Sequence, residues 1–515
     1  LSCVRNLIEI ANIVRGIRVK STDLLTVNKR KKTNPHLFYD KILEGAFRSD
    51  LEAAQFFFKT DTNSSSYKNL KRSLRQKLLN TIFFIEPSTA QSDYERAYLY
   101  CCKNMFAAKI LVFLHAHNSG SDLCKRVFAK ATEFELTEFI IESSRYLRLH
   151  MGTRFGNREK FEEFNELYRT YTKVRAAEHL AEEYYIRLIL PKVHRKSTDD
   201  DTQSQAEEFY RELRPLMEQY GSPFLHFIGR YLQVIALMSV NNYEETIEVC
   251  EQAIQFFDSK PYSYKTPLRV FLHNQLVCYT QLKEYEKGKK VVEKSNLMVR
   301  AGTYSWFQNN ELNLILALHS CNYQESIVIL EHSINHRKFK SMPLVVREQW
   351  LIYEAYVYFL VTIGKIQIPD DRKRRFKLGK FLNSIPTYSK DKRGLNIPIL
   401  IIQILLMIVK KDYERSIDRI DAIEKYCSRY LTDKSNLRSN CFIKMLLQIP
   451  ISGFHKAGVE RRTNKYFQRL LGTPLNISQQ PHEVEIIPYE DLWEFVMESL
   501  ETKYYRQRGS ASRIA

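Results

Sequence analysis

The chain has 515 residues, a formal net charge of +19, and only 16 glycines and 15 prolines. So few glycines and prolines argue against a fold of strands and tight turns, and they favour long helices joined by short loops. The charge suits an acidic partner such as nucleic acid or an anionic membrane, but lysines dispersed over solvated helical faces explain it too.

Residues 1–66 are predicted to form an N-terminal helical segment, with amphipathic stretches at 4–19 and 36–59. Residues 67–205 are predicted to hold degenerate helical repeats. The first helix of this region is expected at 67–86, where leucines recur at helical spacing.

The next helix is expected at 92–117, ending at a turn formed by Asn118, Ser119 and Gly120. Two long helices, parted at 152–157, are expected to follow. The polar stretch 196–205 is expected to be an exposed, mobile loop.

Residues 206–448 are predicted to be an array of helix pairs, introduced by a helix at 206–220. The predicted pairs are 223–240 with 243–258, 266–281 with 285–297, 304–320 with 323–336, 343–363 with 372–384, and 395–410 with 413–431. A further helix is expected at 434–448.

A short phrase recurs where the second helices begin: a tyrosine is followed three residues later by a small residue. The four instances, at steps of 42, 38 and 90 residues, are Tyr243 with Thr246, Tyr285 with Gly288, Tyr323 with Ser326, and Tyr413 with Ser416. Recurrence at this spacing indicates a helical solenoid. The small residue lets a neighbouring helix approach and the ring wedges between helices, so the phrase is interpreted as a packing device.

This arrangement resembles the tetratricopeptide repeat, whose second helix opens with an aromatic residue, a small residue three positions later and an aliphatic residue beside it. The unit at Tyr243 fits best, through Thr246, Ile247 and Ile254. The repeats are longer than the 34 residues of that family, and the first helices lack its Trp, Leu and Gly positions. The resemblance implies an all-α fold, a right-handed alpha-solenoid of stacked helix-turn-helix repeats, over roughly 206–448.

The helical pattern weakens after residue 450. Residues 449–515 are predicted to be an irregular linker followed by a C-terminal amphipathic helix at about 489–505.

Proteins of the family that the chain resembles usually bind peptides or partner helices on a concave face, lined by the first helix of each pair. Polar or amphipathic residues on these predicted helices are therefore candidates to line a peptide groove. They are Tyr231, His273, Asn274, Asn309, Asn310 and Tyr353. The sequence thus predicts a non-enzymatic scaffold or adaptor for a protein or peptide, or a regulator that senses a small signal peptide. Ordinary solvated faces are the simpler explanation of the same residues.

The densest basic run, 371–393, holds nine lysines and arginines against two aspartates. Its candidates for contact with a polyanion are Arg372, Lys373, Arg374, Arg375, Lys377 and Lys380. The alternative function is therefore a nucleic-acid-associated regulator that grips phosphates through this segment. A repeat helix with a charged outer face is the simpler explanation.

No Walker loop, GxSxG motif, Rossmann glycine pattern or paired-carboxylate signature occurs, so we expect no catalytic site and no cofactor. His332 and His336 have a spacing that can ligate a metal, but they lack a third ligand, and no metal site is expected.

The nine cysteines are scattered without a CxxC pair, which favours free thiols in a reducing compartment.

Residues 1–18 lack the apolar core of a secretory signal, so a cytoplasmic location is expected. The chain begins with Leu1 rather than Met, which is compatible with N-terminal sequence that is missing or has been processed. The apolar run 395–409 is shorter than the roughly 20 residues of a membrane span, so a buried helix is expected there.

Overall fold

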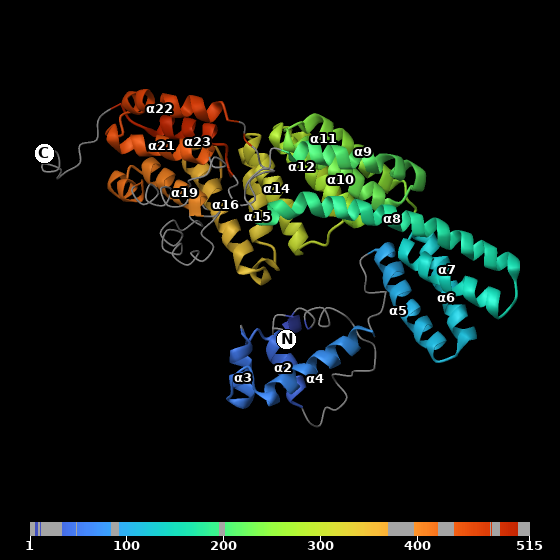
Figure 1. Ribbon diagram of the computed structural model, residues 1–515. Coiled ribbons are helices and arrows are strands. Elements are labelled where there is room, and N and C mark those ends of the chain that lie inside the picture. Colours follow the sequence, from blue (N-terminus) through green and yellow to red (C-terminus); the bar gives the residue numbers. More distant parts are fainter. Residues whose placement is uncertain are drawn as a thin grey trace. The chain divides into compact units, whose positions relative to one another are not determined.

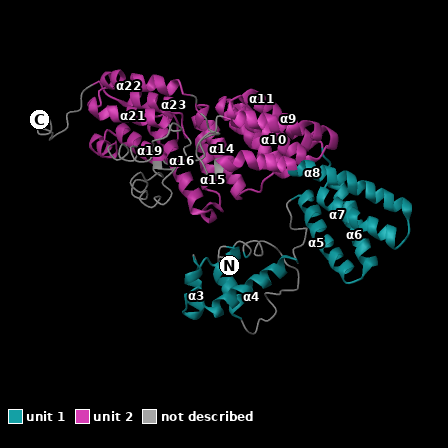
Figure 2. Cartoon of the chain, in the orientation of Figure 1, with its two compact units in different colours: residues 1–179, 260–264 teal, residues 180–259, 265–515 magenta. Residues whose placement is uncertain are grey.

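The computed structural model divides the chain into two compact units (Figure 2). One comprises residues 1–179 with 260–264, and the other comprises 180–259 with 265–515. The structure describes residues 6–8, 11, 33–47, 49–83, 92–194, 201–368, 396–420, 437–473, 475 and 485–502. Within these ranges the regular structure is helical, which confirms the all-α prediction.

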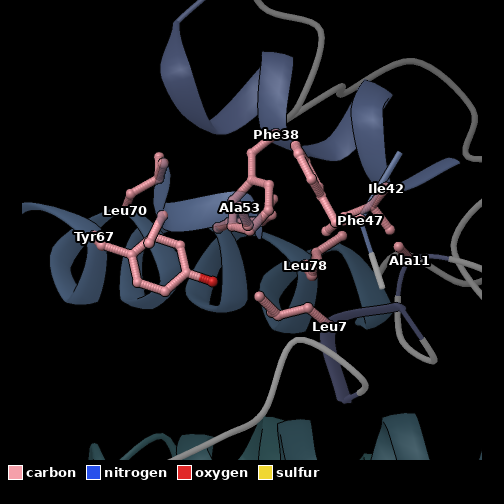
Figure 3. Packing of buried hydrophobic residues seen from close by; sticks show 11 residues of the cluster. Leu7, Ala11, Phe38, Ile42, Phe47, Ala53, Tyr67, Leu70 and Leu78 are labelled. Carbon is pink, nitrogen blue, oxygen red and sulfur yellow. The ribbon is translucent and has the colours of Figure 1, made fainter. Parts of the chain in front are cut away.

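Near its N-terminal end the first unit contains α2 (Asn34–Leu43), α3 (Asp50–Phe58) and α4 (Ser65–Ile82), preceded by helical residues at 6–8 and 11. The stretch at 36–59, predicted as one amphipathic piece, is broken after α2, where Gly45 has a φ of 73°. Phe38 and Tyr67 are fully buried in the core between these helices (Figure 3). The Tyr67 hydroxyl donates to Asp50 over 2.8 Å, so this small core also satisfies its one buried phenol.

Four longer helices follow: α5 (Asp93–Phe113), α6 (His117–Glu133), α7 (Thr137–Thr153) and α8 (Arg158–His194). The predicted turn at 118–120 was wrong, because α6 already begins at His117. Gly120 is a buried position of α6, where a Cβ atom would lie 2.6 Å from Val112 Cγ2 and 3.3 Å from the Ala108 carbonyl oxygen. This glycine therefore serves the close approach of α5 and α6 rather than a turn.

Residues 260–264 belong to the first unit although they lie far along the chain. Lys260 Nζ contacts both carboxylate oxygens of Glu135, at 2.8 and 2.9 Å. The Tyr262 hydroxyl donates to Glu135 over 2.5 Å, and its ring packs on Phe134. One carboxylate at the turn between α6 and α7 thus holds a segment more than 120 residues away.

In the second unit, successive described helices contact one another from α9 to α19 and again from α21 to α23 (Figure 1). They are α9 (Thr202–Tyr220), α10 (Pro223–Ser239), α11 (Tyr243–Asp258), α12 (Lys265–Gln281), α13 (Tyr285–Leu297), α14 (Tyr304–His319), α15 (Tyr323–Ile334), η2 (Phe339–Ser341), α16 (Leu344–Thr362), α19 (Asn396–Val409), α21 (Leu437–Ile451), α22 (Lys456–Leu471) and α23 (Tyr489–Ser499). The three predicted pairs from 223 to 336 are confirmed to within two residues at each end. The predicted helix at 372–384 and all of residues 421–436 lie outside the described residues.

Two predictions for this unit need correction. Residues 202–205, expected in a loop, form the start of α9. The region after 450, expected to be irregular, contains the regular helix α22. Its buried face consists of Val459, Thr463 and Leu470 among mostly charged or polar residues, so its apolar periodicity was too sparse to recognise.

The tyrosine phrase has the packing role predicted for it. Thr246, Ser326 and Ser416 have no solvent exposure, and a Cβ atom on Gly288 would lie 2.6 Å from Leu316 Cδ2 on the next first helix. Small residues at this position therefore allow neighbouring helices to pack closely.

In the pairs that begin with α10, α12, α14 and α19, one repeated turn joins the first helix to the second. Its left-handed residues have φ between 57° and 60°: Asn241, Lys283, Cys321 and Lys411. In each case the next residue's N–H donates to the carbonyl five positions back, as Asn242 does to Leu237 over 3.0 Å. This is the Schellman geometry that ends many helices, here with glycine absent from its left-handed position. His115 and Glu135 adopt it too, at the ends of α5 and α6.

The C-terminal stretch 485–502 returns to the array, where α23 contacts α19, α21 and α22. His319 is fully buried at the end of α14, and its Nε2 lies 2.6 Å from the Glu485 carbonyl oxygen. The Phe495 ring contacts Tyr323 and Phe359. The last helix is therefore part of the packed structure of this unit.

The predicted burial of the apolar run at 395–409 is confirmed for most of α19, where Ile397, Ile399 and the residues from Ile401 to Ile408 have little or no exposure. Across the ranges that the structure describes, we find no helix with the length and apolar content that a bilayer crossing requires.

Candidate binding surface

The first helices of successive pairs contact one another as well as their own partners. Helix α12 touches both α10 and α14, each one pair away along the chain. The first helices α10, α12 and α14 therefore lie side by side in the second unit.

Residues in equivalent positions form a row along this face. Tyr231, His273 and Glu311 each lie twelve residues before the tyrosine that begins the second helix of their own pair. On α16 the equivalent residue is Glu354, which lies ten residues before the left-handed Gly364, as Glu311 lies ten before Cys321. Tyr353 lies beside this position, and its hydroxyl donates to Glu311 over 2.7 Å. We call Tyr231, His273, Glu311 and Glu354 the first-helix row. Its members bring phenol, imidazole and carboxylate groups to one repeated position.

The Glu311 carboxylate is the best-defined polar group of the row. Gln349 Nε2 donates to it over 2.6 Å and also lies 2.8 Å from the Tyr353 hydroxyl. Burial raises the pKa of Glu311, and the hydrogen bond from Tyr353 opposes that shift. Tyr353 itself is buried, and burial raises the pKa of its phenol well above the ordinary value.

Glu354, the residue after Tyr353, is half-buried, and burial raises its pKa. Among the described residues, its carboxylate makes no hydrogen bond or ion pair. A half-buried carboxylate without a partner retains capacity to accept hydrogen bonds from a ligand.

His273 is exposed to solvent, yet burial by surrounding protein atoms, followed by the charge of Arg269, lowers the pKa of its imidazole. The neutral ring can donate from one nitrogen and accept at the other.

Tyr231 is half-buried and lies beside the rings of Tyr185 and Phe227, with centroids 5.9 and 6.3 Å away. Burial raises the pKa of its phenol, so the hydroxyl stays protonated and can donate. Its place next to other rings makes it an aromatic contact point at the α10 end of the row.

The three asparagines predicted to line the groove have partners within the chain. Asn274 Nδ2 donates to the Val270 carbonyl over 2.8 Å, one turn back in α12. Asn309 Nδ2 donates to Ser295 over 2.9 Å, which ties α14 to the preceding helix α13. Asn310 is buried and donates to the Trp306 carbonyl.

Of the six predicted residues, Tyr231 and His273 thus fall in the row, whereas Tyr353 lies beside it with only 2% of its surface exposed. Sequence reasoning missed Glu311, Gln349 and Glu354, because a glutamate on a helix is usually a solvated residue. Counting back twelve residues from each recurring tyrosine would have found Glu311.

His332 and His336 pack around one indole instead of standing apart. Their ring centroids lie 5.1 and 5.0 Å from that of Trp306. In the part of the chain that the structure describes, no group of three or more histidine, cysteine, aspartate or glutamate side chains is placed to hold a metal ion.

The six predicted polyanion contacts, Arg372 to Lys380, lie outside the described residues. Comparison with known proteins gives no match for this chain among protein-family models, curated proteins or solved structures.

Proposed function

We propose that this protein is a non-enzymatic, cytoplasmic scaffold or adaptor that binds a protein or peptide segment along its first-helix row. The supporting observation is that Tyr231, His273 and Glu311 occupy one repeated position on first helices that contact each other. An extended peptide offers backbone donors and acceptors at regular intervals, which suits a row of phenol, imidazole and carboxylate groups.

The proposal includes the finer architecture. The array is a right-handed superhelix of tetratricopeptide type, and the first-helix row lies on its concave face. The contacts of α12 with both α10 and α14, the first helices one pair away on each side, support this arrangement.

A peptide library displayed on phage and selected on the full chain tests the proposal. Selected peptides are then synthesised, and their affinity is measured by fluorescence anisotropy. Substituting His273→Ala or Glu354→Gln is expected to weaken binding at least tenfold. The control His332→Ala, an exposed histidine on second helix α15, is expected to change the affinity less than twofold.

The proposal would be contradicted if the selection enriched no peptide on this chain beyond the level found on an unrelated helical protein. Binding that His273→Ala and His332→Ala reduce equally would also count against it. The alternative, a nucleic-acid-associated regulator acting through 371–393, rests on the charge of that sequence.

A further inference from the structure

The helix that the sequence pattern failed to reveal, α22, carries the strongest basic surface among the described residues of the second unit. It holds five cations and a single carboxylate, that of Glu460. Arg461, Lys465 and Arg469 follow one another at intervals of four residues, and Arg462 lies next to Arg461. With Lys444 of the adjacent helix α21, we call them the α22 basic face.

These cations are not used to hold the fold together. In the described part of the chain, none of the five makes an ion pair with a carboxylate, whereas many other exposed lysines and arginines do. All five side chains are exposed. Their positive charge is therefore available to an external anion.

The surface is hollowed rather than flat. Arg461, Arg462 and Lys465 line an open hollow of about 460 Å³ with Asn464, Gln448 and Tyr466. Lys465 Nζ lies 4.7 Å from the centre of the Tyr466 ring, and Lys444 Nζ lies 5.9 Å from it. One aromatic ring thus organises cations from two helices.

We propose that the α22 basic face binds a nucleic-acid strand, with phosphates on Arg461, Arg462 and Lys465 and a base against Tyr466. Guanidinium groups match phosphate oxygens through two parallel N–H donors, and an aromatic ring among cations is the usual platform for an unpaired base. The site is separate from the first-helix row and does not depend on the proposed function.

A nucleic-acid strand fits this surface better than a membrane or an acidic protein. A bilayer surface is flat and would use apolar side chains beside the cations, whereas the lining of the hollow is polar apart from Tyr466. An acidic protein would satisfy the charge but gives no role to a ring placed among the cations.

The test measures binding of the full chain to fluorescently labelled 20-nucleotide oligo(U), oligo(dT) and a DNA duplex at several salt concentrations. The variant Arg461→Gln/Arg462→Gln/Lys465→Gln removes three phosphate contacts. Its affinity for the single strands is expected to fall at least tenfold, and the slope of log K against log salt is expected to become shallower by about 2. A matched variant, Arg72→Gln/Arg75→Gln/Lys103→Gln, removes three exposed cations from α4 and α5 and is expected to change affinity less than twofold.

A second variant, Tyr466→Leu, separates stacking from charge. It is expected to weaken single-strand binding about fivefold or more while leaving the salt slope unchanged. Circular dichroism and the melting temperature of each variant verify that it is folded.

Several outcomes would overturn the proposal. The first is an equal loss of oligonucleotide affinity in the two triple variants. The second is binding that is lost only when the charges of 371–393 are neutralised. The third is polyglutamate that competes for the protein as well as an oligonucleotide does. Binding to anionic vesicles without binding to any oligonucleotide would also overturn it. Preference for the oligonucleotides over the duplex supports the role of Tyr466, and preference for the duplex contradicts it.

Discussion

The Tyr353 hydroxyl donates to a Glu311 carboxylate oxygen over 2.7 Å, although the two residues are 42 positions apart. Gln349 reaches the same oxygen from α16. Because Glu311 and Tyr353 belong to the successive first helices α14 and α16, this hydrogen bond joins one repeat directly to the next.

Substituting Tyr353→Phe removes one donor from a carboxylate that stays largely buried. We expect the free energy of unfolding to fall by about 1–3 kcal/mol, measured by urea denaturation. Tyr304→Phe, on an exposed ring at the start of α14, is the control and should stay within about 0.5 kcal/mol of wild type. Equal effects of the two variants would contradict the role assigned to this hydrogen bond.

The same pair predicts a pH dependence. Burial raises the pKa of Glu311 in the folded chain, so its contribution to stability is greatest below the unfolded pKa, near 4.5, and is lost as pH rises through the folded pKa. Removing the Tyr353 donor raises this pKa further. The penalty of Tyr353→Phe should therefore be larger at neutral pH than at about pH 4.

The left-handed residue of the repeated turn offers a stabilising substitution. Lys283 has a φ of 57°, which costs a residue with a side chain about 1–2 kcal/mol, whereas glycine adopts it freely. We expect Lys283→Gly to raise the free energy of unfolding by about 0.5–1 kcal/mol. Lys290→Gly, in the middle of α13, should lower it by about 1 kcal/mol, so the two Lys→Gly variants should shift the urea midpoint in opposite directions.

The small residue of the tyrosine phrase predicts a steric penalty. A Cβ atom on Gly288 would lie 2.6 Å from Leu316 Cδ2 and 3.3 Å from Tyr279 Cβ. At Gly458 of α22, the nearest atom is Ser452 Cβ, at 3.4 Å. Gly288→Ala should therefore be less stable than Gly458→Ala by about 1–3 kcal/mol, because overpacking outweighs the better helix propensity of alanine. Equal stability of the two variants would show that α13 and α14 are not closely packed at this position.

Much of the array could be predicted because one short sequence pattern recurs along it. The tyrosine phrase marks where second helices begin, and the structure begins α11, α13 and α15 at Tyr243, Tyr285 and Tyr323. The turns before them were harder to recognise, because asparagine, lysine and cysteine occupy a left-handed position where glycine would have been the signal.

The candidate surface was only partly predictable. Tyr231 and His273 were recognised as polar residues on first helices, but Glu311 acquires its character from burial and from donors on another helix. Gly120 shows the opposite failure. It looked like a turn residue, yet it is a contact between two helices, and only the tertiary structure distinguishes these roles.

Arg438 of α21 is the centre of a buried ion-pair network. Its guanidinium donates to both oxygens of Glu485, at 2.6 and 3.0 Å, and also contacts Glu490. Arg438→Met should lower the free energy of unfolding by about 3–5 kcal/mol, because it leaves a buried carboxylate without its counter-ion.

Adding Glu485→Gln and Glu490→Gln to Arg438→Met removes the unpaired charges and should recover part of that loss. Urea denaturation followed by circular dichroism compares the two variants. A triple variant less stable than Arg438→Met alone would mean that the network acts through shape and hydrogen bonding rather than through charge.

His319 makes the attachment of the C-terminal stretch sensitive to acid. Burial lowers the pKa of His319 to about 4, and its Nε2 donates to the Glu485 carbonyl oxygen. Because the folded pKa lies below the ordinary value near 6.5, the contribution to stability is present above 6.5 and is lost as pH falls through 4. Between about pH 7 and pH 4, the free energy of unfolding of the wild type should fall by about 3 kcal/mol more than that of His319→Gln. Glutamine keeps a hydrogen-bond donor that does not titrate. His332→Gln, an exposed histidine, should follow wild type, and parallel stability curves for wild type and His319→Gln would contradict the prediction.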